Sequence, residues 1–315
     1  MHRDLADSVL LIIAVALLSM MILAMPLGAI AFYDGELGKT YNPNSTTDKL
    51  FAFVFGLPIS IPVITSFSTV FVAFWLVYMA MMMISLKMPS ASIISVLRGN
   101  AKPLENPLIA VAVTFSVTFL TLNLLVSVQN YLGIPSGGLK DADQLLLFIQ
   151  ATLAPLREEF GFRLSIIGVL ASIIAFRSKG LQGFGCLLFP KKYLPSTRFT
   201  RRALLLLNVG SAIYFGITHL IYEPGVWQIG KVSESVVAGL ALGWIYIEYG
   251  FFAAVLLHWA FNYFLSALQL YETAFGSFGL SQGATALISL LVIVYIVNLA
   301  YATVRPDSKR NLPLQ

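Results

Sequence analysis

Charged residues are scarce in this chain. Only 11% of its 315 residues are Asp, Glu, Lys or Arg, 58% are hydrophobic, and the mean hydropathy is +0.82. Soluble domains usually carry about 25% charged residues, so this composition excludes a soluble globular protein. The sequence therefore predicts an all-α, polytopic membrane protein.

Cysteine and histidine are also rare. The single Cys186 excludes an internal disulfide and any metal site built from several cysteines. One of the three histidines is the terminal His2, which leaves His219 and His258 as candidates for chemistry. Neither a G-x-S-x-G nor an H-E-x-x-H motif is present, so no serine or cysteine is placed as a nucleophile and no helical zinc-protease motif occurs.

Long apolar windows mark the expected membrane spans, because a helix needs about 20 apolar residues to cross a bilayer. The shorter stretch 51–60 contains Pro58, and we interpret it as an interfacial lead-in. Segment 144–176 would measure about 50 Å as one straight helix, and Pro155 predicts a break in it. Eight transmembrane helices are expected, over residues 8–32, 61–86, 106–128, 144–176, 203–221, 233–248, 250–269 and 284–304.

The loops between these windows alternate in charge. Loop 177–202 holds seven basic residues and no acidic one, and 87–105 is also net positive, whereas 33–50 and 129–143 are net negative. The positive-inside rule then predicts a cell-membrane protein with both termini in the cytoplasm. This topology explains the net charge of +5 without a nucleic-acid partner, and we expect loop 177–202 to contact anionic lipid headgroups.

Several polar side chains fall inside the apolar windows, where a charged group costs about 2.5–3.5 kcal/mol and usually has a function. Glu159 and Arg163 are four residues apart, which predicts an ion pair on one helical face. Glu158 points about 100° away from that pair. The same spacing recurs in two later windows, between Phe215 and His219 and between His258 and Asn262.

These residues allow several interpretations. A carboxylate beside an imidazole can activate water, and a second imidazole with a carboxamide can stabilise an oxyanion, which together describe hydrolysis of an amide. A glutamate with two histidines can instead bind a divalent metal. The ion pair and the histidines can also be structural links between helices. From the residues alone, these interpretations stay open.

In this order, the three polar clusters resemble the motifs of the CAAX prenyl protease and bacteriocin-processing family (CPBP, also called Abi) of intramembrane glutamic endopeptidases. The motif E-E-x-x-x-R corresponds to residues 158–163, F-x-x-x-H to 215–219 and H-x-x-x-N to 258–262. The glycine-spaced stretch 235–250 also looks like the helix that precedes the third motif of the family.

The resemblance implies a catalytic core over residues 144–265. Three helices without a motif would precede it in 1–143, and a last helix and basic tail would follow in 266–315. No metal or cofactor is implied. The implied general base is Glu158 assisted by His219, the implied oxyanion hole is His258 with Asn262, and the implied supporting residues are Glu159, Arg163 and Phe215.

The implied substrate is a peptide or a prenylated protein in the bilayer, cut near its end by glutamate-activated water. Two alternatives remain: a non-proteolytic scaffold or self-immunity protein of the same fold, and a proton-coupled transporter that uses Glu158 and Glu159. Counting along the fourth window places Glu158 in the outer half of the membrane, whereas CAAX processing in the family occurs at the cytoplasmic face. The sequence leaves this depth open.

Overall fold

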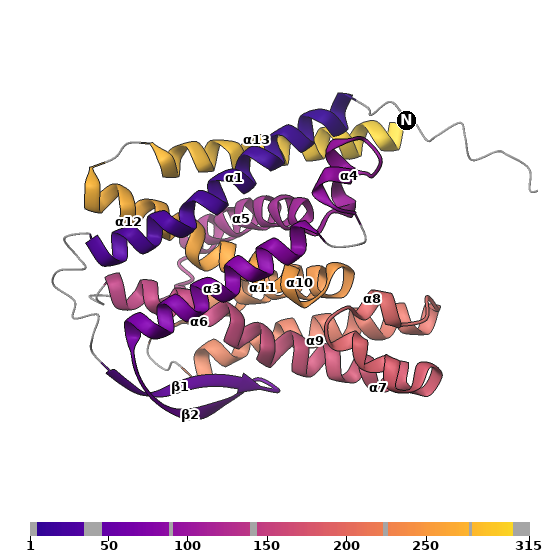
Figure 1. Ribbon diagram of the computed structural model, residues 1–315, viewed down its shortest axis with the longest axis horizontal. Helices are drawn as coiled ribbons and strands as arrows, with labels where there is room; N and C mark the ends of the chain where they lie inside the picture. Colours follow the sequence, from indigo (N-terminus) through magenta and orange to yellow (C-terminus); the bar gives the residue numbers. More distant parts are fainter. Residues whose placement is uncertain are drawn as a thin grey trace, which may run out of the picture.

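A computed structural model describes residues 5–34, 46–87, 91–138, 144–222, 226–276 and 279–304. Most of these residues form helices that run back and forth along the long axis of the molecule (Figure 1). The longer helices are α1 (Leu5–Asp34), α3 (Phe67–Leu86), α5 (Pro107–Tyr131), α6 (Gln144–Glu159), α7 (Val169–Lys179), α9 (Arg198–Tyr222), α10 (Ile229–Tyr249), α11 (Phe251–Trp259), α12 (Leu265–Phe275) and α13 (Leu280–Val304). Shorter helical elements are α4 (Ile93–Leu97), η1 (Pro103–Glu105), η3 (Gly180–Leu187) and α8 (Pro190–Tyr193).

Two stretches have the wider winding of a π-helix. They are η2 (Phe160–Gly168), which joins α6 to α7, and η4 (Ala260–Phe264), which joins α11 to α12. Each therefore continues a longer helical rod rather than ending it.

Within the described residues, seven helical rods are long and apolar enough to cross a membrane. The other predicted span is α10, which has 21 residues but carries Lys231, Glu234 and Glu248. It packs along α9 and also contacts α5 and α11, so much of its surface faces protein. The prediction of an all-α polytopic membrane protein is confirmed, with seven apolar rods and one more polar helix instead of eight similar spans.

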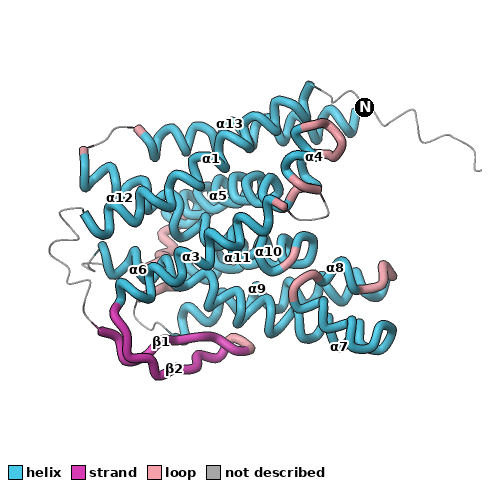
Figure 2. The backbone as a smooth tube through the Cα atoms, viewed as in Figure 1, coloured by secondary structure: helices cyan, strands magenta, loops and turns pink. Residues whose placement is uncertain are grey.

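The second predicted span, 61–86, begins six residues before the helix does, because residues up to Ser66 form a strand. Strands β1 (Thr46–Val54) and β2 (Leu57–Ser66) form an antiparallel hairpin, and the helix starts only at Phe67. Phe55 and Gly56 both have positive φ, as a two-residue hairpin turn requires. The prolines in β2 also disfavour a helix there. Figure 2 shows the hairpin along one side of the helical bundle, where β1 contacts α6 and η2.

The predicted break at Pro155 is wrong. Helix α6 continues through this proline to Glu159, and the chain stays helical into η2 and α7. The Tyr78 hydroxyl donates to Thr152 O at 2.6 Å and accepts from the Leu156 N–H at 3.4 Å. An uninterrupted α-helix pairs those two backbone groups with each other. The side chain from α3 therefore satisfies the backbone where proline disturbs α6.

The basic loop 177–202 is mostly folded. Helix α7 is followed by η3 and α8, which enclose a small apolar cluster. Its buried members are Ala171, Ala175, Cys186 and Leu194. The rod from Phe148 to Leu187 spans 40 residues, more than the roughly 20 that cross a bilayer, so part of it must extend beyond the hydrocarbon region.

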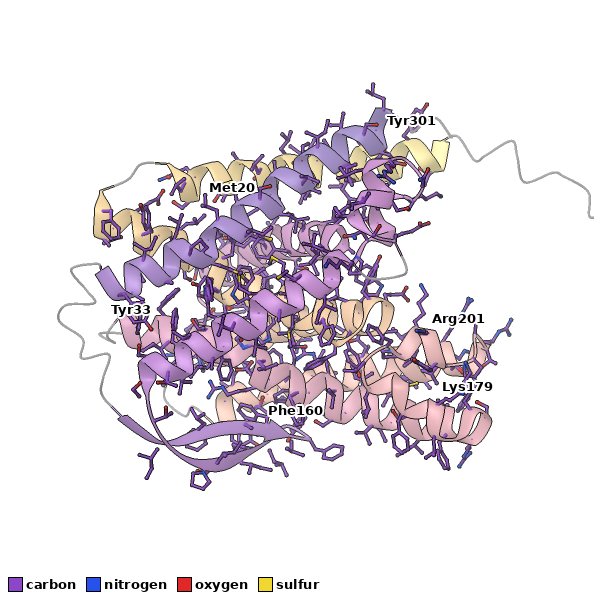
Figure 3. The ribbon with its side chains drawn as sticks, viewed as in Figure 1. Met20, Tyr33, Phe160, Lys179, Arg201 and Tyr301 are labelled. Carbon is purple, nitrogen blue, oxygen red and sulfur yellow. The ribbon has the colours of Figure 1, made fainter. Side chains whose placement is uncertain are left out.

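The basic end and the opposite end of the bundle are clearly separated. Lys179, Arg201 and Tyr301 lie at one end, and Tyr33 lies at the other (Figure 3). The first is also the end at which α1 begins (Figure 1). Residues 35–45 and 139–143, which belong to the two net negative loops of the charge count, lie outside the described residues, as does the C-terminal tail from residue 305.

Candidate active site

Both segments that carry the central polar residues change their winding at the site. Helix α6 ends at Glu159 and η2 begins at the next residue, while α11 ends at Trp259, one residue after His258, and η4 follows. Short π-helical segments inside α-helices are frequent at functional sites. No sequence pattern predicted them, because the four-residue motif spacing is also that of an ordinary α-helical turn.

His258 lies between the two glutamates of the first motif. Its Nδ1 is 2.7 Å from Glu159 Oε1, and its Nε2 is 3.6 Å from Glu158 Oε2. Glu159 is fully buried, and the side chains of His258 and Glu158 are 6% and 18% exposed. Glu158 is therefore outside the Glu159–Arg163 pair, as predicted, but it has an imidazole beside it.

Arg163 holds the buried glutamate from the other side. Its Nη1 is 3.1 Å from Glu159 Oε1, and both side chains are fully buried, so the predicted ion pair is present. Arg163 Nη2 donates to Gly239 O at 3.2 Å, and the guanidinium lies 4.6 Å from the centroid of the Phe215 ring. A Cβ at Gly239 would lie 3.0 Å from Ala212 and 3.3 Å from Arg163 Nη2. The absence of a side chain there lets α10 approach both groups.

His219 reaches the same site from helix α9 and packs against Phe215. Its Nδ1 is 2.9 Å from Phe215 O, and its ring packs edge-to-face on Phe215 at 4.9 Å. A carbonyl oxygen accepts only, so the proton is assigned to Nδ1, which leaves a lone pair on Nε2. The imidazole in direct reach of Glu158 is that of His258 rather than His219. The pairing of Glu158 with a specific histidine was beyond sequence reasoning, because three separate helical rods meet here.

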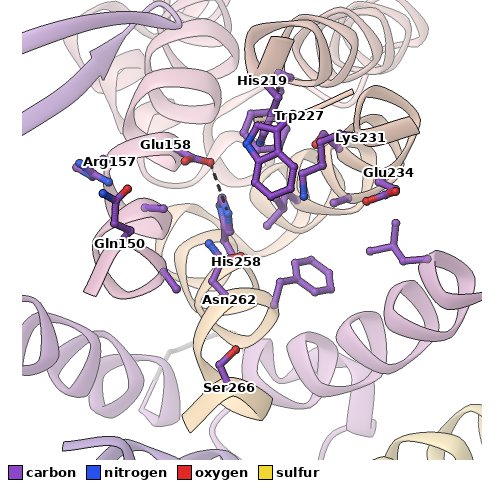
Figure 4. Close-up of a pocket in the computed structure, with 18 of the residues that line it drawn as sticks. Gln150, Arg157, Glu158, His219, Trp227, Lys231, Glu234, His258, Asn262 and Ser266 are labelled. Carbon is purple, nitrogen blue, oxygen red and sulfur yellow. Dashed lines mark hydrogen bonds and ion pairs between the residues drawn. The ribbon is translucent and has the colours of Figure 1, made fainter. Parts of the chain in front are cut away.

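A cavity of about 1090 Å³ opens beside these residues. Glu158, His219, His258 and Asn262 all line it, and Figure 4 shows Asn262 next to His258 on the same helical rod. Phe215 also lines it, whereas Glu159 and Arg163 are buried outside the lining. The four residues predicted to be catalytic thus share one cavity, and two of the three supporting residues lie behind it.

Sequence reasoning missed other residues of the cavity wall. Phe53 comes from β1, in a segment that was not expected to form strands, and its ring contacts Phe162 and Tyr222. Trp227 and Lys231 come from the start of α10 and the turn before it. Lys231 could have been singled out from the sequence as a candidate cavity residue, since charged residues are rare near the apolar windows.

The alternative of a metal centre needs at least three ligands close together. Over the residues that the structure describes, no group of three or more His, Cys, Asp and Glu side chains is arranged to hold a metal ion. The two glutamates and His258 are instead paired with each other and with Arg163.

Comparison with known families adds an independent observation. Residues 142–264 match the family model described as type II CAAX prenyl endopeptidase, Rce1-like. This segment is similar to the Rce1-like family. It contains all three motifs and both π-helical stretches, so the resemblance found from the motifs is confirmed over this part of the chain. No curated protein and no solved structure matches the chain.

At the level of the family, the Rce1-like match supports a CAAX-type intramembrane protease. The seven apolar rods agree with a multi-pass membrane protein. The match ends before α12 and includes neither the hairpin nor α1, α3 and α5. Of those elements, β1 of the hairpin, α5 and α12 complete the cavity wall around the Rce1-like segment.

Proposed function

We propose that the protein is an intramembrane glutamic endopeptidase that hydrolyses a peptide bond near the end of a prenylated protein or peptide. The observation that carries the proposal is the row Glu158–His258–Glu159–Arg163 at the edge of the cavity. The Arg163 guanidinium offsets the charge of the fully buried Glu159 carboxylate. Such a balance limits the large cost of burying ions away from water.

In the proposed reaction, Glu158 is the general base. It removes a proton from a water molecule in the cavity while the water oxygen attacks the carbonyl carbon of the scissile amide. His219 Nε2, with a free lone pair, accepts the other hydrogen bond of this water. Glu158 then returns the proton to the nitrogen of the leaving amine as the C–N bond breaks.

The remaining residues stabilise the oxyanion and hold its donors in place. His258 Nε2 and the Asn262 carboxamide donate hydrogen bonds to the oxygen of the tetrahedral intermediate. Glu159 accepts from His258 Nδ1 and so fixes the ring orientation, while Arg163 holds Glu159 from the other side. The low exposure of these groups strengthens every one of these interactions, because little water is present to screen them.

The test is cleavage of an S-farnesylated peptide that ends in a cysteine and three further residues, in proteoliposomes. We expect Glu158→Gln to lower kcat by about 10²–10⁴-fold and His258→Ala by a similar factor, while the thermal stability of Glu158→Gln stays near that of wild type. The exposed Lys102 does not line the cavity, and Lys102→Gln serves as control. Equal cleavage by wild type and Glu158→Gln would sink the catalytic assignment.

We also propose that the basic end of the bundle faces the cytoplasm and meets anionic headgroups. All seven basic residues of 177–202 are exposed, and of these Lys191 forms an ion pair with Glu248. Anionic lipids attract such residues by about 1 kcal/mol each. In a Lys192→Cys protein, the thiol at this exposed position is expected to resist a membrane-impermeant thiol reagent in intact cells and to react after lysis. Labelling in intact cells contradicts this orientation.

A further inference from the structure

One cation projects into the cavity at a distance from the proposed catalytic row. Lys231 lies in the first turn of α10, lines the cavity and is partly buried. Its Nζ lies 4.4 Å from the centroid of the Trp227 ring, a cation–π contact. Figure 4 shows Trp227 and Lys231 on the side of the cavity opposite Arg157. The two positive groups therefore face the cavity from different walls.

Helix stability does not explain a lysine at this place. The first turn of a helix carries partial positive charge, so a cation there is unfavourable. Among the ion pairs of the described residues, none includes Lys231. Glu234, one turn later, instead accepts a hydrogen bond from Ser136.

The backbone around Trp227 and Lys231 is held by a second loop. Gly138 N donates to Val226 O at 2.9 Å, Gln228 N donates to Ser136 O at 3.0 Å, and Gly230 N donates to Pro135 O at 2.9 Å. The buried Gln129 adds a hydrogen bond from Nε2 to Gly230 O at 3.0 Å. These hydrogen bonds fix the backbone that carries Lys231.

We propose that Lys231, supported by Trp227, binds the terminal carboxylate of the peptide substrate. The inference rests on the proposed endopeptidase function and adds to it a residue that recognises the free end of the chain. Lysine provides three donors and a compact charge, and hydrogen bonds between charged groups are about twice as strong as neutral ones. Partial burial favours an ionic partner supplied by the substrate.

The spacing suits a short C-terminal segment. The Trp227 ring is 6.5 Å from the His219 ring and 4.4 Å from Lys231 Nζ, so Lys231 Nζ and the His219 ring are separated by about 11 Å at most. Three extended residues span roughly 10 Å. A carboxylate on Lys231 therefore places a bond up to about three residues from the chain end beside His219, in agreement with the three residues that follow cysteine in a CAAX sequence.

Binding tests this inference separately from cleavage. The farnesylated peptide is prepared with a free C-terminal carboxylate and with a C-terminal amide, and its anisotropy is measured with Glu158→Gln protein in phosphatidylcholine nanodiscs. We expect the acid to bind about tenfold or more tightly than the amide. Adding Lys231→Gln should remove this preference, Lys231→Arg should keep most of it, and Lys102→Gln should leave it unchanged.

Three results overturn the inference: equal binding of acid and amide, a preference that survives Lys231→Gln, or a preference lost equally with Lys102→Gln. Phosphatidylglycerol in the nanodiscs tests a lipid phosphate as the anion instead. If Lys231→Gln weakens binding of this lipid but leaves the peptide preference intact, the cation serves a lipid. If the wild-type protein does not cleave the peptide but the preference for the acid still depends on Lys231, the hydrolytic mechanism is contradicted and the carboxylate site is supported.

Discussion

The two halves of the described chain contribute to the cavity in different ways. The half that contains 144–222 and 226–264 supplies every carboxylate, imidazole and guanidinium of the proposed catalytic row. The half that contains 5–34, 46–87 and 91–131 supplies apolar wall residues such as Phe53, together with single hydrogen bonds to the other half. The family match, over residues 142–264, lies in the region that supplies the proposed catalytic row.

The two regions differ because catalysis restricts the choice of residues more than the packing of a cavity wall does. Acid–base chemistry needs particular groups at particular separations, so few residue types serve and a motif results. A wall or a helix contact needs volume and apolarity, which many residues supply. Tyr78 shows the intermediate case, since one hydroxyl in α3 satisfies the α6 backbone one turn before Glu158 and Glu159.

The largest expected change in stability comes from the second half. Arg163→Met leaves the buried Glu159 without its guanidinium, and removing one partner of a buried ion pair costs about 3–5 kcal/mol. We expect a large fall in the melting temperature in detergent and loss of peptide cleavage. Arg98→Met makes the same change at an exposed position and should leave both properties near wild type. A stable, active Arg163→Met protein contradicts the importance of the buried row.

A smaller effect is expected from the first half. Tyr78→Phe keeps the ring but removes the hydroxyl shared by Thr152 O and Leu156 N, at a cost of about 1–3 kcal/mol. The melting temperature should fall by less than for Arg163→Met, and kcat should fall because α6 carries Glu158. Tyr131→Phe alters a tyrosine that is 89% exposed and serves as the matched control. If both tyrosine variants behave alike, the support of α6 by Tyr78 is wrong.

Much of the site was predictable because its residues lie one helical turn apart. The pairing of Glu159 with Arg163 follows from a spacing within a single segment, and the structure contains it. The partner of His258 was not predictable in this way, since Glu159 lies 99 residues away in the chain. The assignment of catalytic roles to Glu158, His219, His258 and Asn262 stays a prediction for the cleavage assay.

For the fold, too, features set by one segment were predicted, whereas features that depend on contacts between segments were not. Apolar windows correctly indicated a multi-pass helical protein, because the bilayer thickness sets the length of a spanning helix. The break at Pro155 was wrong, because a hydroxyl from another helix restores the hydrogen bonding that local sequence loses. The hairpin 46–66 was missed, because an apolar run that is rich in β-branched residues looks like the start of a span.

By itself, the sequence determined the membrane class, the course of most helices and the residues able to do chemistry. Each of these depends on composition or on spacing within one helix. The tertiary structure decided that His258 lies between Glu158 and Glu159, that Arg163 is covered by Gly239 and Phe215, and that Lys231 shares their cavity. Such contacts join residues distant in the chain, so only the packing of the helices brings them together.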